Sequence, residues 1–162
     1  MLRIGKWLKK RKKSNRALKI LLTTNAFVLI AGAMLAPIYA IFVEEIGGDL
    51  LDASITAGIF AVAAGLTTLA SGRFSDKIKN SELVIVFGYL LLGGGFIAIT
   101  QVNSIGALFI VQAIIGIAEA IYAPAFDSLY SRHLDKHQEG SEWGSWEAIN
   151  YFTYAGGQSS AD

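Results

Sequence analysis

Uncharged stretches that are long enough to cross a lipid bilayer dominate the pattern of the chain. No charged side chain occurs within residues 20–43, 55–71 or 83–117. A membrane-crossing helix needs about 20 apolar residues, because the hydrocarbon core is roughly 30 Å thick. The third stretch is too long for one crossing, and a polar turn at residues 101–104 divides it. The pattern therefore predicts four spans, near residues 20–43, 55–71, 83–100 and 105–125, and a partial fifth over residues 143–157.

The spans predicted near residues 83–100 and 105–125 are apolar on every side, which favours helices in lipid or in a bundle over helices at a water-facing surface. We therefore expect an all-α membrane protein, a multi-span helical bundle over residues 20–162 that follows a basic arm at residues 1–19. The first stretch is longer than the roughly 7–15 residues of a signal-peptide core. We expect it to remain as a span, with the lipid bilayer as the first partner of the protein.

The basic residues predict the orientation. Nine of the fourteen Lys and Arg precede the first span, and the loop at residues 44–53 has none, only four acidic residues. The other five follow either the second or the fourth span. All fourteen thus fall on one side, which the positive-inside rule assigns to the cytoplasm. We predict an integral protein of the cytoplasmic (plasma) membrane with a cytoplasmic N-terminus.

Five basic residues follow one another from Lys9 to Lys13. Clusters of this kind bind nucleic acid or anionic lipid. Because this run adjoins a predicted span, its role in setting the topology and meeting lipid headgroups is the simpler interpretation. We expect no nucleic-acid partner.

Composition and spacing do not support an enzyme. The chain has no cysteine, so it lacks a catalytic thiol and a thiolate metal site. His133 and His137 have the i, i+4 spacing of a helical metal pair, but no third ligand accompanies them. The sequence also lacks a nucleophilic triad, a nucleotide-binding loop and a metal-hydrolase motif. We therefore expect no catalytic residue, no metal and no cofactor.

Three polar residues within the predicted spans are candidates for a substrate or ion pathway: Glu119, Gln112 and Asn25. A carboxylate at the depth of Glu119 is costly and usually faces a cavity or a partner. For Glu119, a role in substrate contact or proton exchange and a structural hydrogen bond to another helix both remain open. Gln112 lies seven residues earlier, on roughly the same helix face. For Gln112 and Asn25, hydrogen bonding between helices is the simpler interpretation.

Small residues and prolines predict how the helices pack. Small side chains recur through residues 58–72 at steps of three and four, and Gly88 and Gly95 lie seven residues apart. Such stripes let the backbone of a neighbouring helix approach closely. Pro37 and Pro124 should bend their helices, since proline removes a backbone donor and crowds the preceding turn.

A motif lies between the second and third spans, where residues 72–77 read Gly-Arg-Phe-Ser-Asp-Lys. It resembles the loop between helices two and three of the major facilitator superfamily: Gly, three residues, Asp, then Arg or Lys. The basic residues place this loop on the cytoplasmic side, as in that family. The resemblance implies that Gly72, Asp76 and Lys77 form the motif of the cytoplasmic loop between the second and third spans. The family pattern continues with Gly and further basic residues, whereas residues 79–81 here read Lys-Asn-Ser.

Two later segments resemble the same family. Residues 122–129 are similar to the end of its fourth helix, and residues 140–148 are similar to the entry into its fifth. A subset of the family, mainly proton-coupled exporters, has an Arg four residues before a Gly in the fourth helix. Gln112 stands at that position before Gly116, so proton coupling through this Arg is not supported.

The resemblance implies secondary active transport of a small solute by alternating access, with helices one and four lining a central cavity. Members typically have twelve helices in two halves of six. We therefore expect this chain to be the N-terminal part of such a transporter, a fragment that is inactive alone. Its expected partners are a small-molecule substrate and the missing C-terminal half of the same polypeptide. The alternative is a non-transport membrane anchor or interaction bundle that functions as a small multi-span protein.

Overall fold

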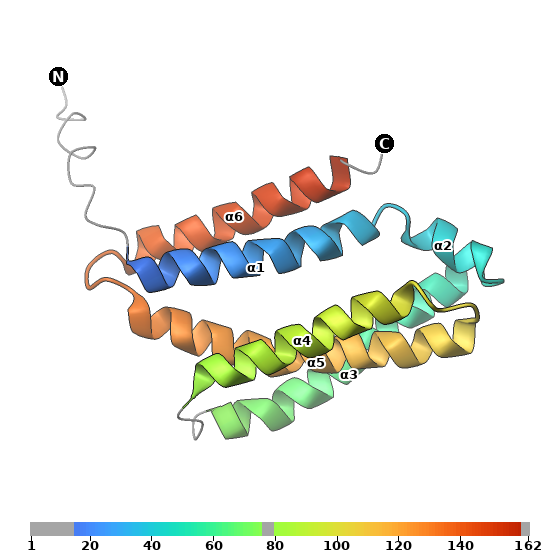
Figure 1. Ribbon diagram of the computed structural model, residues 1–162, viewed down its shortest axis with the longest axis horizontal. Helices are drawn as coiled ribbons and strands as arrows, with labels where there is room; N and C mark the ends of the chain where they lie inside the picture. The colour runs from blue at the N-terminus through green and yellow to red at the C-terminus, as the bar shows by residue number, and fades with distance from the viewer. Residues whose placement is uncertain (1–14, 76–79, 160–162) are drawn as a thin grey trace.

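The computed structural model describes residues 15–75 and 80–159, and all regular structure within this part is helical. This confirms the predicted all-α class. Figure 1 shows the helices as long, roughly aligned rods. In chain order they are α1 (Arg16–Leu35), α2 (Tyr39–Glu45), α3 (Leu50–Ser75), α4 (Ser81–Ile99), α5 (Ile105–His133) and α6 (Glu139–Ser159).

The helices form two groups. The pair α1 and α6 lie side by side, and α3, α4 and α5 form the second group, with the short α2 near the start of α3 (Figure 1). Helix α5 packs along both α3 and α4. Within their apolar windows, 39% of α5 but only 6% of α3 is buried. Helix α5 is therefore the centre of the bundle, while most of α3 faces outward.

Four of the described helices are long and apolar enough to cross a membrane: α1, residues 50–71 of α3, α4 and α5. Large apolar side chains on their outer faces are exposed, among them Phe27, Leu69 and Leu90. Such surface is stable in lipid and unfavourable in water. The protein is therefore an integral membrane protein. Helix α6 has the length of a span but is more polar, because Glu139, Glu142 and other polar residues occupy its first half.

The sequence predicts one bent helix for the first uncharged stretch, but the structure has two separate helices there. Helix α1 ends at Leu35, residues 36–38 form a turn around Pro37, and α2 starts at Tyr39. Proline lacks the backbone N–H that would continue the hydrogen-bond ladder, so it breaks the helix here. Pro124, in contrast, lies inside α5, which continues beyond the predicted end of the span to His133.

Hydrogen bonds join three helix ends on one side of the bundle. The Asn15 side chain caps α1 by accepting from the Ala17 N–H at 3.1 Å, and its Nδ2 donates to the His133 carbonyl at 3.0 Å. The Tyr130 hydroxyl donates to the carbonyl oxygen of Glu142 at 2.7 Å. These bonds fix the starts of α1 and α6 to the end of α5.

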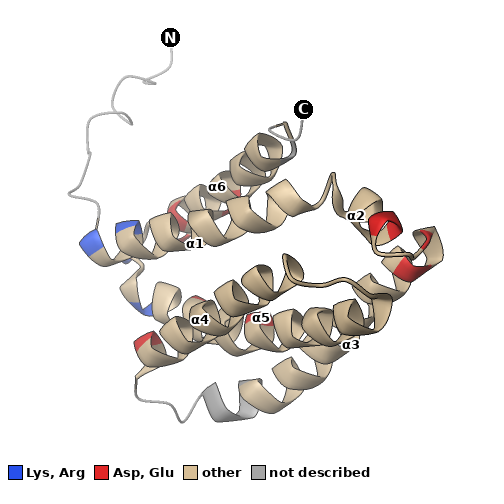
Figure 2. Ribbon diagram, turned by 45° about the vertical axis from the view of Figure 1, so that its right-hand side comes forward, with Lys and Arg blue, Asp and Glu red and all other residues tan. Residues whose placement is uncertain are grey.

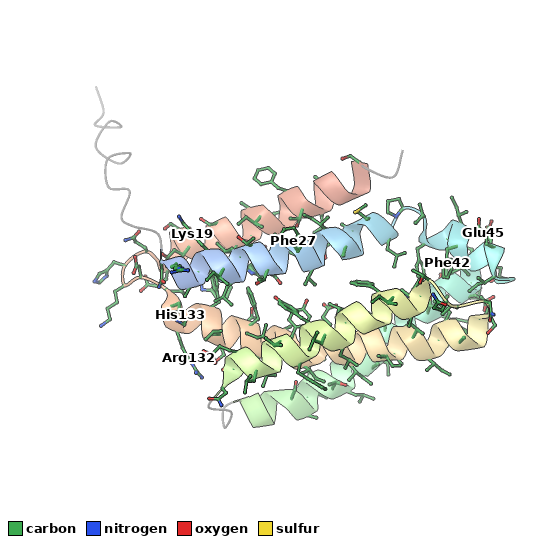
Figure 3. The ribbon with its side chains drawn as sticks, viewed as in Figure 1. Lys19, Phe27, Phe42, Glu45, Arg132 and His133 are labelled. Carbon is green, nitrogen blue, oxygen red and sulfur yellow. The ribbon has the colours of Figure 1, made fainter. Side chains whose placement is uncertain are left out.

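The basic residues gather at one end of the bundle. Figure 2 shows the described Lys and Arg only at the end where α1 starts and α5 finishes, whereas acidic residues lie both at that end, on α4 and α6, and around α2 and the start of α3 at the opposite end. In Figure 3, Lys19 and Arg132 lie at the first of these ends and Glu45 lies at the other. The described residues therefore have the one-sided basic pattern on which the predicted orientation depends.

Glycines determine where the helices approach most closely. A Cβ built on Gly116 of α5 would lie 2.5 Å from the carbonyl oxygen of Phe60 in α3, so the two backbones are in contact there. Gly88 and Gly95 of α4 are likewise buried against α5, which confirms the close packing predicted for that stripe. Gly58 of α3, in contrast, has open space around it, so the predicted stripe on that helix does not contact another described helix there.

The contact at Gly116 predicts a matched pair of variants. Gly116→Ala should lower the free energy of unfolding by about 1–3 kcal/mol, because the added methyl group must push the α3 backbone away. Gly106→Ala, in the same helix but with nothing within 4 Å of its Cβ position, should be neutral or stabilising by up to about 1 kcal/mol. Unfolding of the detergent-solubilised protein, followed by circular dichroism, measures both. Equal effects of the two substitutions would contradict the close α3–α5 contact.

Candidate functional site

A cavity of about 230 Å³ lies between the α1/α6 pair and the other three helices. Figure 3 shows side chains from both groups extending into the space between them. Each of the five long helices contributes to the cavity wall, and α5 supplies its strongest polar groups. The wall consists of Val28, Leu29, Gly32, Leu35, Phe60, Leu92, Phe96, Ile99, Gln112, Ile115, Glu119, Tyr122 and Tyr154.

Gln112 and Glu119 both line this cavity, two helical turns apart on α5. Their spacing of seven residues predicts a shared face, and the structure places them on one wall. Asn25, the third candidate, is only 5% exposed on α1 and does not belong to that wall. The structure therefore brings two of the three candidate residues together. A pathway role for any of the three remains a prediction.

Among the described residues, Glu119 is the only carboxylic acid on the wall, and no Lys, Arg or His accompanies it there. A carboxylate in an apolar span without a cationic partner is costly. Glu119 therefore has unused capacity to bind a proton or a positively charged group.

Aromatic side chains surround the carboxylate. Phe60, Phe96, Tyr122 and Tyr154 come from four different helices and all line the cavity. Tyr122 is held in place by Tyr89, whose ring centroid lies 4.7 Å away at an interplanar angle of 59°. The cavity is thus apolar and aromatic, with a carboxylate and an amide at defined positions, a composition common in small-molecule sites.

The amide of Gln112 belongs to a chain of hydrogen bonds that joins three helices. Its Nε2 donates to the Tyr39 hydroxyl of α2 at 2.7 Å, and that hydroxyl donates to Thr56 Oγ1 of α3 at 2.8 Å. Thr56 is fully buried and donates in turn to the Ala53 carbonyl at 2.7 Å. Each hydroxyl acts once as donor and once as acceptor, so every bond has a consistent direction.

Gln112 and Tyr39 also line a second, more open cavity of about 340 Å³. It shares Gly32, Leu35 and Phe60 with the first cavity. The hydrogen-bonded amide therefore stands where the two cavities adjoin, toward the end of the bundle that carries α2. This position makes the Gln112–Tyr39–Thr56 chain the boundary of the Glu119 cavity on that side.

Comparison with known proteins identifies the family of the chain. The model of the Major Facilitator Superfamily matches residues 21–158, which is most of the chain. The chain belongs to the major facilitator superfamily. The proteins of this superfamily are transporters rather than enzymes, in agreement with the absence of catalytic motifs from the sequence.

Individual relatives within the major facilitator superfamily are bacterial. The chain is 32% identical over 110 residues to the uncharacterized MFS-type transporter YqjV of Bacillus subtilis. The matched segment covers 65% of the chain and 26% of YqjV. It is 27% identical over 124 residues to the multidrug resistance protein MdtG of Escherichia fergusonii, covering 72% of the chain and 29% of the relative. For MdtG of Salmonella typhimurium the identity is 27%, and 30% of the relative is covered. The chain thus spans less than a third of the length of these relatives.

The loop motif of the superfamily is only partly visible in the structure. Gly72 lies near the end of α3, whereas Asp76 and Lys77 lie outside the described residues. Their role as a cytoplasmic loop motif remains a prediction from the sequence.

Sequence reasoning missed Tyr39 and Thr56. Both belong to uncharged stretches in which a single hydroxyl is common, and neither forms a motif with Gln112, which is 73 residues from Tyr39. The one available signal was Pro37, because a helix break next to a tyrosine frees that side chain to point across the bundle. The aromatic residues of the wall also carry no pattern that separates them from ordinary core residues.

The hydrogen-bond chain predicts energetic coupling between Tyr39 and Gln112. Tyr39→Phe should destabilise the protein by about 1–3 kcal/mol, because Gln112 and the buried Thr56 each lose a partner. In a cycle with Gln112→Leu, the double variant should be less destabilised than the sum of the single variants by about 1 kcal/mol. Tyr151→Phe, at a side chain that is 71% exposed, serves as the control and should have no effect. Strict additivity in chemical unfolding of the detergent-solubilised protein would show that the two residues do not interact.

Proposed function

We propose that the protein performs secondary active transport of a small solute by alternating access, and that Glu119, Gln112 and Asn25 belong to its substrate or ion pathway. The observation that carries the proposal is the cavity between the two helix groups, with the Glu119 carboxylate on its wall. Membership of the major facilitator superfamily supports transport in general.

A charged group within a span is unfavourable and is usually retained where it faces a cavity or a partner. Glu119 lacks a charged partner on the cavity wall. Secondary transporters place substrate and coupling-ion sites near the bilayer midplane, between parts that move relative to each other. A carboxylate in a mid-span cavity is consistent with such a site.

Alternating access requires two parts that move against each other around the site. The relatives are more than three times as long as the segment that they share with this chain, which covers 26–30% of them. We propose that the rest of the polypeptide supplies the facing half of the pathway, and that the described bundle does not transport by itself.

The relatives also bear on the solute and on the alternative function. Two of them are named multidrug resistance proteins, which favours a drug-like organic solute over an inorganic ion. A membrane anchor or interaction bundle needs no carboxylate-lined cavity, and membership of a transporter superfamily does not favour it.

We further propose that the protein lies in the plasma membrane with its N-terminus in the cytoplasm. The support is the placement of Arg16, Lys19 and Arg132 at one end of the bundle, and of Glu44 and Glu45 at the other. Under the positive-inside rule the first end faces the cytoplasm.

The transport proposal is tested with the complete protein in cells that lack other drug exporters. A panel of cationic, neutral and anionic toxic compounds is loaded, and accumulation is followed with and without a protonophore. The complete protein should change the accumulation of at least one compound in a gradient-dependent way. Glu119→Gln should slow that flux by about tenfold or more, since hydrogen bonds to a charged group contribute about 1.5–3 kcal/mol.

Glu147→Gln is the matched control, because Glu147 is exposed on α6 and does not line the cavity. It should transport like the unmodified protein at equal abundance in the membrane. Transport that survives in Glu119→Gln at the level of Glu147→Gln would remove Glu119 from the pathway.

A further inference from the structure

We propose that the Glu119 cavity binds an amphipathic organic cation, whose positive group lies at the carboxylate and whose apolar part lies among the aromatic side chains. This inference rests on the proposed transport function and names the class of substrate.

The charge of the cavity is the first argument. Glu119 contributes a negative charge when ionised, and no basic residue in the described part of the wall offsets it. An anionic solute would meet uncompensated repulsion in a medium of low dielectric constant. A neutral solute would leave the carboxylate as unpaired as in the empty cavity, whereas an organic cation supplies the missing partner and carries apolar surface into an apolar site.

The aromatic lining is the second argument. Phe60, Phe96, Tyr122 and Tyr154 line the same cavity as the carboxylate. The faces of aromatic rings attract cations, and this attraction strengthens when the cation loses its water. Carboxylate and rings therefore favour the same kind of ligand.

The donor set argues against a bound inorganic cation. Ions such as Ca²⁺ and Mg²⁺ take six or more oxygen ligands from carboxylates, carbonyls and water. The described part of the chain holds no group of three or more His, Asp or Glu that could bind a metal ion. Gln112, the other strong polar group of the wall, already donates through Nε2 to the Tyr39 hydroxyl. One carboxylate among apolar and aromatic groups thus suits a diffuse, weakly hydrated organic cation.

Size limits the ligand. The cavity of about 230 Å³ lies below the roughly 300–1,000 Å³ of typical ligand pockets, so the part described here fits a compact group such as an aryl ammonium head. A larger substrate would extend beyond the wall formed by these helices.

A pair of isosteric probes tests the inference. Phenyltrimethylammonium and tert-butylbenzene have the same shape and differ by one positive charge. Their binding to the complete protein in lipid nanodiscs is measured by equilibrium dialysis at alkaline pH, where the carboxylate is ionised, and empty nanodiscs are subtracted. The cation should bind about tenfold or more tightly than the neutral isostere, the equivalent of about 1.4 kcal/mol.

Variants assign the preference to the site. Glu119→Gln should remove most of the cation preference and leave the smaller part that the rings supply, whereas Glu147→Gln should keep the full preference. Phe96→Leu, which removes one ring and keeps the apolar character, should weaken cation binding more than binding of the neutral probe. Equal affinity for the two probes, or a cation preference that Glu119→Gln leaves undiminished in a protein of normal thermal stability, would overturn the proposal.

Failure of this inference is distinguishable from failure of the transport proposal. If cells show Glu119-dependent flux of only neutral or anionic compounds, and phenyltrimethylammonium does not bind preferentially, the substrate class is wrong and transport stands. If the cation binds through Glu119 but no compound of any charge is transported by the complete protein, the transport proposal fails and the cation site stands.

Discussion

Helix α5 touches α3 backbone to backbone at Gly116, and the geometry of the site depends on that contact. The carbonyl of Phe60 occupies the space that any side chain at Gly116 would need. Gln112 lies four residues before this glycine and Glu119 three after it, so the contact determines how far both polar groups project from α3. On α4, Gly88 packs against the α5 backbone at Tyr122 and Ala118, and Gly95 leaves room for the Ile115 side chain of α5. In a membrane, where lipid removes most of the hydrophobic driving force between helices, such close packing is a main source of affinity between them.

A second constraint concerns polar groups, which need partners within the span. Pro37 ends α1 and lets Tyr39 of α2 reach across to Gln112 and Thr56. That chain gives the amide nitrogen of Gln112 a partner, whereas Glu119 has no Lys, Arg or His beside it in the described part of the wall. Gln112 and Glu119 thus share one face of α5 but differ in their hydrogen bonding and surroundings. One closes a hydrogen-bond network at the boundary of the cavity, and the other remains available to a ligand.

The fold was largely predictable from the sequence, and the site only in part. Uncharged length and the one-sided basic residues predict α1, α3, α4 and α5, because the bilayer sets the length of a span. The break at Pro37 was expected as a bend, since the sequence does not tell whether neighbouring contacts will support a kinked helix or a separate one. The shared face of Gln112 and Glu119 follows from helical spacing. The partners of Gln112, and the absence of Asn25 from the cavity wall, depend on how the α1/α6 pair docks on the other helices, which no local pattern specifies.

The central claim is that Glu119 faces a pathway that opens in turn to each side of the membrane. The most direct measurement is the reaction of a cysteine at position 119, in a complete protein otherwise free of cysteine, with a membrane-impermeant maleimide. Asp49→Cys and Lys136→Cys serve as one-sided references, because both positions are exposed near opposite ends of the bundle. The account predicts that Asp49→Cys reacts only from outside the cell, Lys136→Cys only from inside, and Glu119→Cys from both sides. Reaction of Glu119→Cys from one side only, or from neither, would contradict it.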